Sequence, residues 1–211
     1  MKIAVVSESP ADEAAIKILV DAILAHETEL VSAPRLRPGG WPQVLQLLPT
    51  IFKALHYSTE AEAIAVVVDS DNSSVHRLDH PLDQECHSEC RVCLLRSCLR
   101  TSLLRVSPVS NRTTIRTAVG VAVPAIEAWY RCGVDTHVNE ARWIGKLSGE
   151  PINYTKRSLK IDVYGSDQPG LHAETIAAVE AANRLANNID QLRQLFPRGF
   201  GCLVTDVRNW L

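Results

Sequence analysis

Residues 63–71 of this chain, AIAVVVDSD, decide its fold class. The first six are apolar without a break, which predicts a strand covered on both faces, as at the centre of a parallel sheet. The run ends directly in Asp69-Ser70-Asp71, so two carboxylates follow the carboxyl end of that strand. Packing offers neither aspartate a role there, and the pair is therefore the leading candidate for a functional site.

Strands and helices are expected to alternate along the rest of the chain. Further strands are predicted at 2–6, 29–32 and 114–123. Apolar residues at helical spacing predict helices over 16–24, 44–55, 82–104, 173–186 and 189–196. Pro124 fits the first turn of one more helix, which carries Ile126, Glu127 and Trp129. The segment 145–170 is the least regular and is expected to be a long surface excursion.

This order of elements predicts one α/β domain with a Rossmann-like, largely parallel sheet flanked by helices. Its core is expected over about 1–135, followed by a helical C-terminal extension over about 136–211. Of 211 residues, 46% are hydrophobic and 22% are charged, as in ordinary globular proteins, and the formal net charge is −2. A non-specific nucleic-acid coat protein usually has a basic excess, so this charge counts against that class.

No apolar run reaches the roughly 18 residues of a membrane span, and the N-terminus lacks the pattern of a signal peptide. We therefore expect a cytoplasmic protein without a membrane partner. Its six cysteines are then expected to be thiols or metal ligands rather than a disulfide framework.

Acidic residues follow three of the predicted strands. Glu8 comes just after the first strand, Asp69 and Asp71 come after the central one, and Glu127 lies just inside the helix after a third. Ligands bind outside the carboxyl ends of parallel strands, so these carboxylates should converge on one hard cation, Mg²⁺ or Mn²⁺. Simpler interpretations stay open: Asp12, one of the small residues before it, or Asp71 as a helix cap, Glu8 as a solvated loop carboxylate, and Glu127 as a partner of a helix dipole.

Two of these motifs resemble the TOPRIM domain shared by topoisomerases, bacterial primases and OLD-type nucleases. They are residues 5–13, VVSESPADE, and residues 66–71, VVVDSD. Residues 124–129, PAIEAW, resemble the Pro-x-x-Glu-x-Trp motif of small stand-alone TOPRIM-like proteins related to OLD-type nucleases. The glycine that follows the first glutamate in that family is Ser9 here, and a glycine would let the backbone turn more tightly beside the site.

The resemblance implies a Mg²⁺-dependent nuclease that hydrolyses nucleic-acid phosphodiesters, with a role in phage defence. It implies Glu8, Asp69 and Asp71 as catalytic residues and metal ligands, with Glu127 as an additional ligand. It leaves open whether a companion ATPase or a homo-oligomer is required. Two rival functions also stay open: a non-catalytic TOPRIM-like binding module or partner-dependent subunit, and a hydrolase of small phosphate esters.

A second candidate site lies in a segment that contains His76, His80, Cys86, His87, Cys90, Cys93 and Cys98. Cys90-x-x-Cys93 has zinc-ligand spacing, and Cys86 would share a helical face with both. The sequence has no second pair to complete a tetrahedral set, so thiols packed on a helix face are the favoured interpretation and zinc is not expected.

Basic residues form two clusters. Arg91 begins a series with Arg96, Arg100 and Arg105 on the helix predicted over 82–104, and the second cluster is Lys156, Arg157 and Lys160. Arg91, Lys156 and Lys160 are candidates for contacts with a phosphate backbone. For the arginine series, a solvated helix face is the favoured interpretation.

Overall fold

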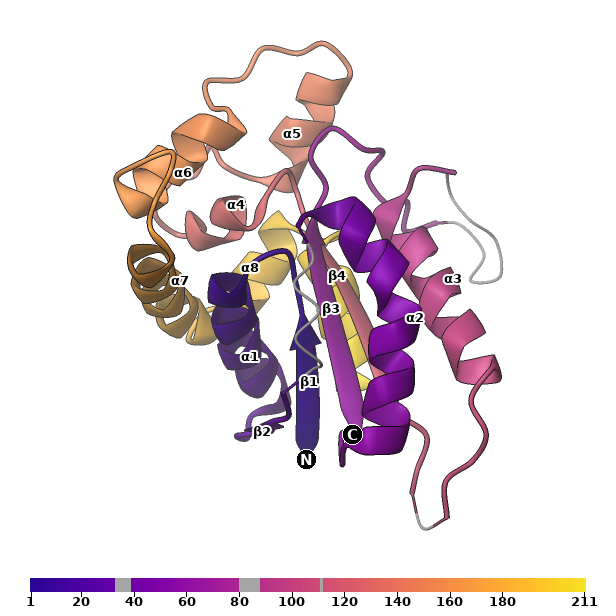
Figure 1. Ribbon diagram of the computed structural model, residues 1–211. Coiled ribbons are helices and arrows are strands. Elements are labelled where there is room, and N and C mark those ends of the chain that lie inside the picture. The colour runs from indigo at the N-terminus through magenta and orange to yellow at the C-terminus, as the bar shows by residue number, and fades with distance from the viewer. Residues whose placement is uncertain (33–38, 80–87, 111) are drawn as a thin grey trace.

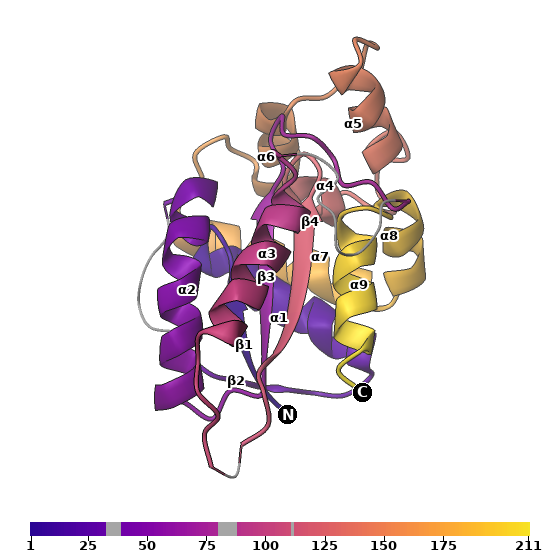
Figure 2. The same ribbon diagram turned by 90° about the vertical axis from the view of Figure 1, so that its right-hand side faces the viewer.

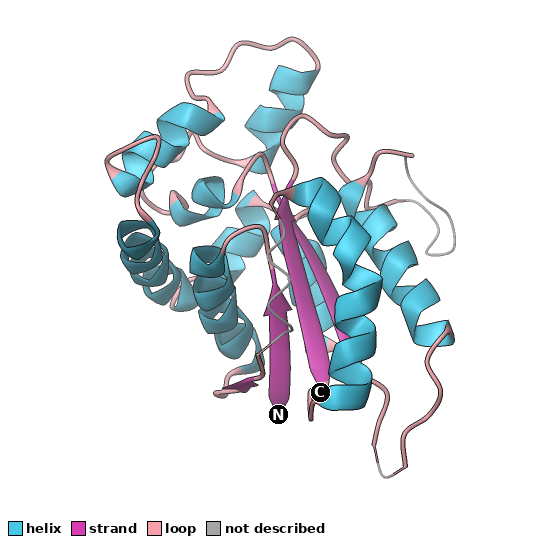
Figure 3. Cartoon of the chain, in the orientation of Figure 1, coloured by secondary structure: helices cyan, strands magenta, loops and turns pink. Residues whose placement is uncertain are grey.

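The centre of the molecule is a parallel sheet. The computed structural model describes residues 1–32, 39–79, 88–110 and 112–211 (Figure 1). Its four strands stand in the order β2-β1-β3-β4, and they are β1 (Lys2–Val6), β2 (Glu29–Leu30), β3 (Ala63–Asp69) and β4 (Arg116–Ala122). All three pairings are parallel, with Ile3 opposite Ala63 and Ala63 opposite Arg116. The sheet and its flanking helices confirm the predicted α/β class (Figure 3).

Both faces of the sheet are covered by helices, as the apolar run of β3 predicts. Ile64, Val66 and Val68 pack with α2 (Trp41–Ser58) and α3 (Arg91–Leu104). Ala65 and Val67 face the other way, toward a cluster built by α1, α7 and α9. These three helices span Pro10–Leu24, Leu171–Ala186 and Phe200–Arg208. Figure 2 shows the sheet edge-on between the two helical layers.

The strand order reverses between β1 and β3. From β1 the chain passes through α1 to β2 on one side, and then through α2 to β3 and β4 on the other. Loops that leave two such strands part in opposite directions, which opens a crevice at the carboxyl ends of the strands. The carboxylates predicted after β1 and β3 therefore lie at the position where open α/β sheets bind their ligands.

Short helices gather above this end of the sheet. They are α4 (Ile126–Tyr130), α5 (Glu140–Leu147) and α6 (Lys156–Tyr164), and α8 (Ile189–Leu195) connects α7 to α9 (Figure 1). Helices α7 and α9 pack against α1 and β4, so residues expected as a C-terminal extension form much of one hydrophobic layer. Within the described part of the chain, no helix has the length and apolar character needed to cross a membrane.

Three predictions of local structure are wrong. The segment 145–170 is not an irregular excursion, because it contains the end of α5 and the whole of α6. The helix expected over 82–104 begins only at Arg91, since Cys90 is extended and precedes the first turn; residues 82–87 lie outside the described range. Pro124 lies ahead of α4 rather than in its first turn, and its carbonyl accepts the Asp71 N–H at 2.9 Å.

Candidate functional site

Glu8 and Asp69 meet where the strand order reverses. Glu8 follows β1 and Asp69 ends β3, and Glu8 Oε1 accepts a hydrogen bond from the Asp69 N–H at 2.9 Å. Ser9 caps α1 next to Glu8, because its hydroxyl oxygen accepts the Ala11 N–H. The cap of α1 is therefore Ser9, one of the small residues ahead of Asp12, and Glu8 is tied to the central strand rather than left in solvent.

Asp69 and Asp71 converge on one cationic atom. Lys156 Nζ lies 2.9 Å from Asp69 Oδ2 and also forms an ion pair with Asp71 Oδ1. Arg91 pairs with the other oxygen of Asp71 at 2.9 Å and donates to the Asp69 carbonyl oxygen. Arg91 is also stacked over the Trp41 ring at 4.9 Å. Arg91 is thus part of the carboxylate site and not of a solvated helix face.

The conformation of Asp71 allows this convergence. Its φ is 52°, in the left-handed region that aspartate enters more readily than most residues. The Asp71 carbonyl accepts the Trp143 indole N–H at 3.1 Å, and its own N–H is held by Pro124. The loop after β3 therefore turns back, so that its carboxylate reaches the same lysine as Asp69.

The charges of the site shift its pKa values in opposite directions. Burial and the neighbouring Asp71 raise the pKa of Asp69, although Lys156 opposes the rise. Burial also opposes ionisation of Asp71, but Lys156 and Arg91 outweigh it and hold the pKa of Asp71 below its usual value. Lys156 is itself partly buried, yet the two aspartates raise its pKa. The lysine is therefore a fixed positive charge between two carboxylates.

Glu127 lies behind Asp69 in the first turn of α4. The Ile126 N–H donates to Asp69 Oδ1 at 2.9 Å, which ties the start of α4 to the end of β3. The Glu127 side chain is only 3% exposed, and Lys160 lies 3.9 Å from its Oε1. Among the described residues Oε2 has no hydrogen-bond partner. Burial and the charge of Asp69 raise the pKa of Glu127 to about 7, so this carboxyl can gain or lose a proton near neutral pH.

A further acidic residue, Asp12 of α1, stands close to Glu127. Burial and the charges of Asp69 and Glu127 raise the pKa of Asp12 well above its usual value. Asp12 accepts a hydrogen bond from the Tyr130 hydroxyl at 3.3 Å. The sequence had suggested only a helix cap for Asp12, since the packing of α1 against α4 could not be seen from spacing.

The residues predicted for the acidic site are thus brought together. Glu8, Asp69, Asp71 and Glu127 share the carboxyl end of the sheet. Arg91, Lys156 and Lys160 each pair with one or more of these carboxylates.

Two other basic residues of the predicted clusters form ion pairs outside this site. Arg157 pairs with Asp167, and Arg96 pairs with Asp206 beside a cavity of about 1120 Å³ between α3, α8 and α9.

The donors suit a hard cation in chemistry but are not arranged as a compact cage. Within the described ranges, the acidic side chains do not bring three ligand atoms within 4.8 Å of one another; His76, Cys90 and Cys93 do. Mg²⁺ is commonly held by only one or two carboxylates, with water and substrate phosphate completing its shell. The ammonium of Lys156 shows that Asp69 and Asp71 can share one cation, so these two residues fit such an ion.

Comparisons of the chain with protein-family models, with curated proteins and with solved structures found no match.

Proposed function

We propose that this chain is a Mg²⁺- or Mn²⁺-dependent phosphodiesterase that acts on nucleic acid, as the resemblance to TOPRIM-like proteins implies. The observation that carries the proposal is the shared cation of Asp69 and Asp71 at the reversal of strand order. Two carboxylates aimed at one positive atom, in the crevice of an open parallel sheet, are what a phosphoryl-transfer site requires.

In this proposal Asp69 and Asp71 hold the divalent ion. When bound, the ion polarises a phosphoryl oxygen and neutralises developing charge. With Asp69 and Asp71 holding the ion, Lys156 would be free to turn toward the substrate. Lys156 and Arg91 then bind and orient the negatively charged phosphate, each through several N–H donors. Arg91 and Lys156 are two of the three residues predicted to contact nucleic acid; the third, Lys160, lies beside Glu127.

Glu127 is the proton-transfer group in this proposal. Its pKa of about 7 suits a group that takes up and releases a proton at neutral pH. Glu8 has a different role. It holds the Asp69 N–H and thereby positions the end of β3, while burial raises its own pKa.

The decisive experiment compares wild type with Asp69→Asn on labelled single- and double-stranded DNA and RNA, with Mg²⁺ or Mn²⁺. Asparagine keeps Oδ1 as the acceptor for the Ile126 N–H, so the variant loses the charge and keeps the hydrogen bond. Asp162→Asn on the exposed side of α6 is the matched control. We expect cleavage that needs the metal, falls by at least about 100-fold in Asp69→Asn and is unchanged in Asp162→Asn.

Equal cleavage by wild type and Asp69→Asn would refute the assignment of the site. One observation favours a rival, a non-catalytic binding module: Lys156 and Arg91 already neutralise both aspartates. Binding of Mn²⁺ or nucleic acid by wild type without turnover would establish that rival. Turnover of a small phosphate ester without nucleic-acid cleavage would identify a phosphatase instead.

A further inference from the structure

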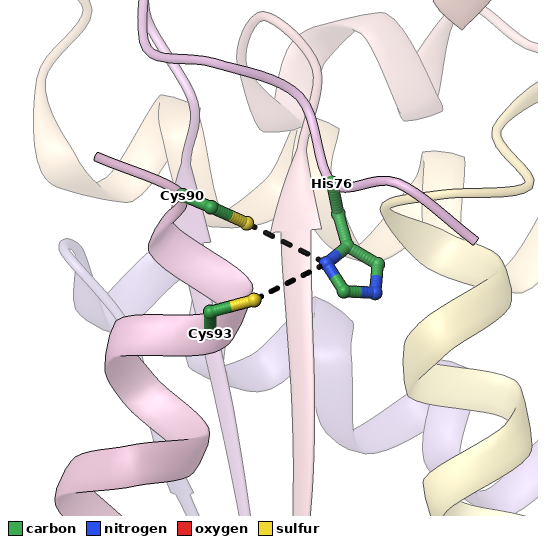
Figure 4. A group of neighbouring side chains, drawn as sticks. All are labelled: His76, Cys90 and Cys93. Carbon is green, nitrogen blue, oxygen red and sulfur yellow. Dashed lines mark hydrogen bonds between the residues drawn. The ribbon is translucent and has the colours of Figure 1, made fainter. Parts of the chain in front are cut away.

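We propose that His76, Cys90 and Cys93 form a zinc site, separate from the carboxylates and independent of the function proposed above. His76 lies in the loop after β3, and the two cysteines lie at the start of α3. Figure 4 shows both sulfur atoms directed at the same nitrogen of the His76 ring. Their ligand atoms all lie within 4.8 Å of one another.

The distances match those of ligands around one zinc ion. Cys90 Sγ and Cys93 Sγ lie 3.5 Å and 3.6 Å from His76 Nδ1. Zinc–sulfur bonds of about 2.3 Å and zinc–nitrogen bonds of about 2.0–2.1 Å, at tetrahedral angles, separate sulfur from nitrogen by about 3.5–3.6 Å. Both sulfur–nitrogen distances are therefore those that a tetrahedral ion imposes, and the three side chains supply three of its four donors.

Hydrogen bonds to His76 Nδ1 do not account for the approach of both sulfur atoms to that nitrogen. Neutral imidazole has one acceptor nitrogen with a single in-plane lone pair, so two thiols cannot both donate to Nδ1 with good geometry. Both sulfurs nevertheless approach that atom at nearly equal distances. An ion at the centre of the three groups would satisfy both sulfurs and the nitrogen at once.

The surroundings favour a soft divalent ion. His76, Cys90 and Cys93 are 5%, 0% and 7% exposed. Cys90 is the N-cap of α3 and Cys93 is in its first turn, where the helix dipole stabilises thiolates. Two buried thiolates need a positive charge beside them. Thiolate and imidazole donors select zinc over Mg²⁺, so the two sites differ in the ion they bind.

The proposed zinc site joins two segments that also contribute to the carboxylate site. They are the loop after β3 and the start of α3. Cys90 and Cys93 flank Arg91 closely in sequence, and His76 follows Asp71 in the same loop. Arg91 and Asp71 form an ion pair at 2.9 Å. Zinc would therefore fix the loop after β3 to the first turn of α3 and hold both members of this pair in place.

The test is metal analysis of the full-length protein purified without chelators. We expect about one zinc per chain in wild type. Cys93→Ser and His76→Ala should retain less than about a tenth of it. Cys98→Ser is the matched control, because Cys98 is a thiol on the same helix that donates toward Leu45 and lies outside the cluster. This control should keep its zinc.

Cobalt substitution of wild type tests the ligands without any variant. Co²⁺ should give the strong visible and thiolate charge-transfer absorption of a tetrahedral site, and a zinc chelator should lower the unfolding temperature by at least about 5 °C. Protein that contains no zinc and gives no cobalt spectrum would overturn the proposal. So would a Cys90–Cys93 disulfide found by mass spectrometry in the freshly purified chain, or equal zinc content in Cys93→Ser and Cys98→Ser. None of these readouts depends on nucleic-acid cleavage.

Discussion

Replacing Glu127 by glutamine should stabilise the protein at alkaline pH. Glu127 is 3% exposed, and burial together with the charge of Asp69 raises its pKa from 4.5 to about 7. Between these two values the folded chain keeps a proton that the unfolded chain releases. Stability therefore falls as the pH rises from about 4.5 through 7, and the charged form costs about 3 kcal/mol above pH 8.

Glu127→Gln removes this cost because glutamine does not ionise. At pH 8 the variant should be more stable than wild type by up to about 3 kcal/mol, or roughly 6–12 °C in unfolding temperature. The attraction to the half-exposed Lys160, 3.9 Å away, lowers the pKa of Glu127 and is already contained in this figure. At pH 4 the two proteins should unfold alike. Urea titrations followed by tryptophan fluorescence at several pH values measure this difference.

Glu140→Gln is the informative control. Glu140 is equally buried, and burial raises its pKa to about 7 as well. Its two oxygens, however, accept the N–H groups of Arg198 and Gly199 at 2.7 Å and 2.8 Å. Glutamine has one acceptor oxygen, so this variant should lose about 1–3 kcal/mol even at low pH. A Glu127→Gln variant that is also less stable than wild type at pH 8 would show that Glu127 Oε2, like the oxygens of Glu140, makes an interaction that glutamine cannot make.

Four more variants test other parts of the structure. A side chain at Gly199 would overlap the carbonyl oxygen of Val121, so Gly199→Ala should cost about 3 kcal/mol or more in urea denaturation. Gly145→Ala meets only the flexible end of another side chain within a helix and should be neutral or stabilising by up to about 1 kcal/mol. Lys156→Met leaves two aspartates without their shared cation; its unfolding temperature should drop, and millimolar Mg²⁺ should restore it more than it raises that of wild type. Ser9→Ala removes the cap of α1 and should cost about 1 kcal/mol, measured by thermal unfolding.

The sheet and the acidic half of the site could be predicted from sequence because their signals are local. The apolar run 63–68 can be satisfied only between two helical layers, and both layers are present. The carboxyl ends of parallel strands share one edge, so placing Glu8 and Asp69 after two strands was enough to bring them together. The same reasoning could not supply the strand order, and it is the reversal between β1 and β3 that makes this edge a crevice.

Three helices, α5, α6 and α9, were not predicted from the sequence, although α6 and α9 carry clear signals. Thr155 caps α6 and Gly165 ends it at a φ of 73°, which are ordinary start and stop residues. Phe200, Leu203, Val204 and Val207 follow helical spacing and are all buried in α9. The omission of α6 mattered most, because it hid the position of Lys156 between the two aspartates.

The cysteine grouping could be predicted from sequence only in part. Grouping Cys86 with Cys90 and Cys93 assumed one continuous helix, but α3 begins after Cys90, and Cys86 lies outside the described residues. The observed third member is His76, which is separated from Cys90 by 14 residues. Ligands from two segments meet through tertiary packing, so helical spacing could identify only the cysteine pair.

The carboxylate site and the proposed zinc site have chemically distinct donor atoms. Oxygen donors lie at the strand ends, and sulfur and nitrogen donors lie at the start of α3. Mg²⁺ added to the protein should therefore not displace zinc, and a chelator selective for zinc should leave Asp69 and Asp71 able to bind Mn²⁺. Arg91 connects the two sites directly, because it follows Cys90 in the chain and pairs with Asp71. If zinc removal weakens Mn²⁺ binding in wild type, the same treatment should have little effect in Arg91→Ala, where this connection is absent.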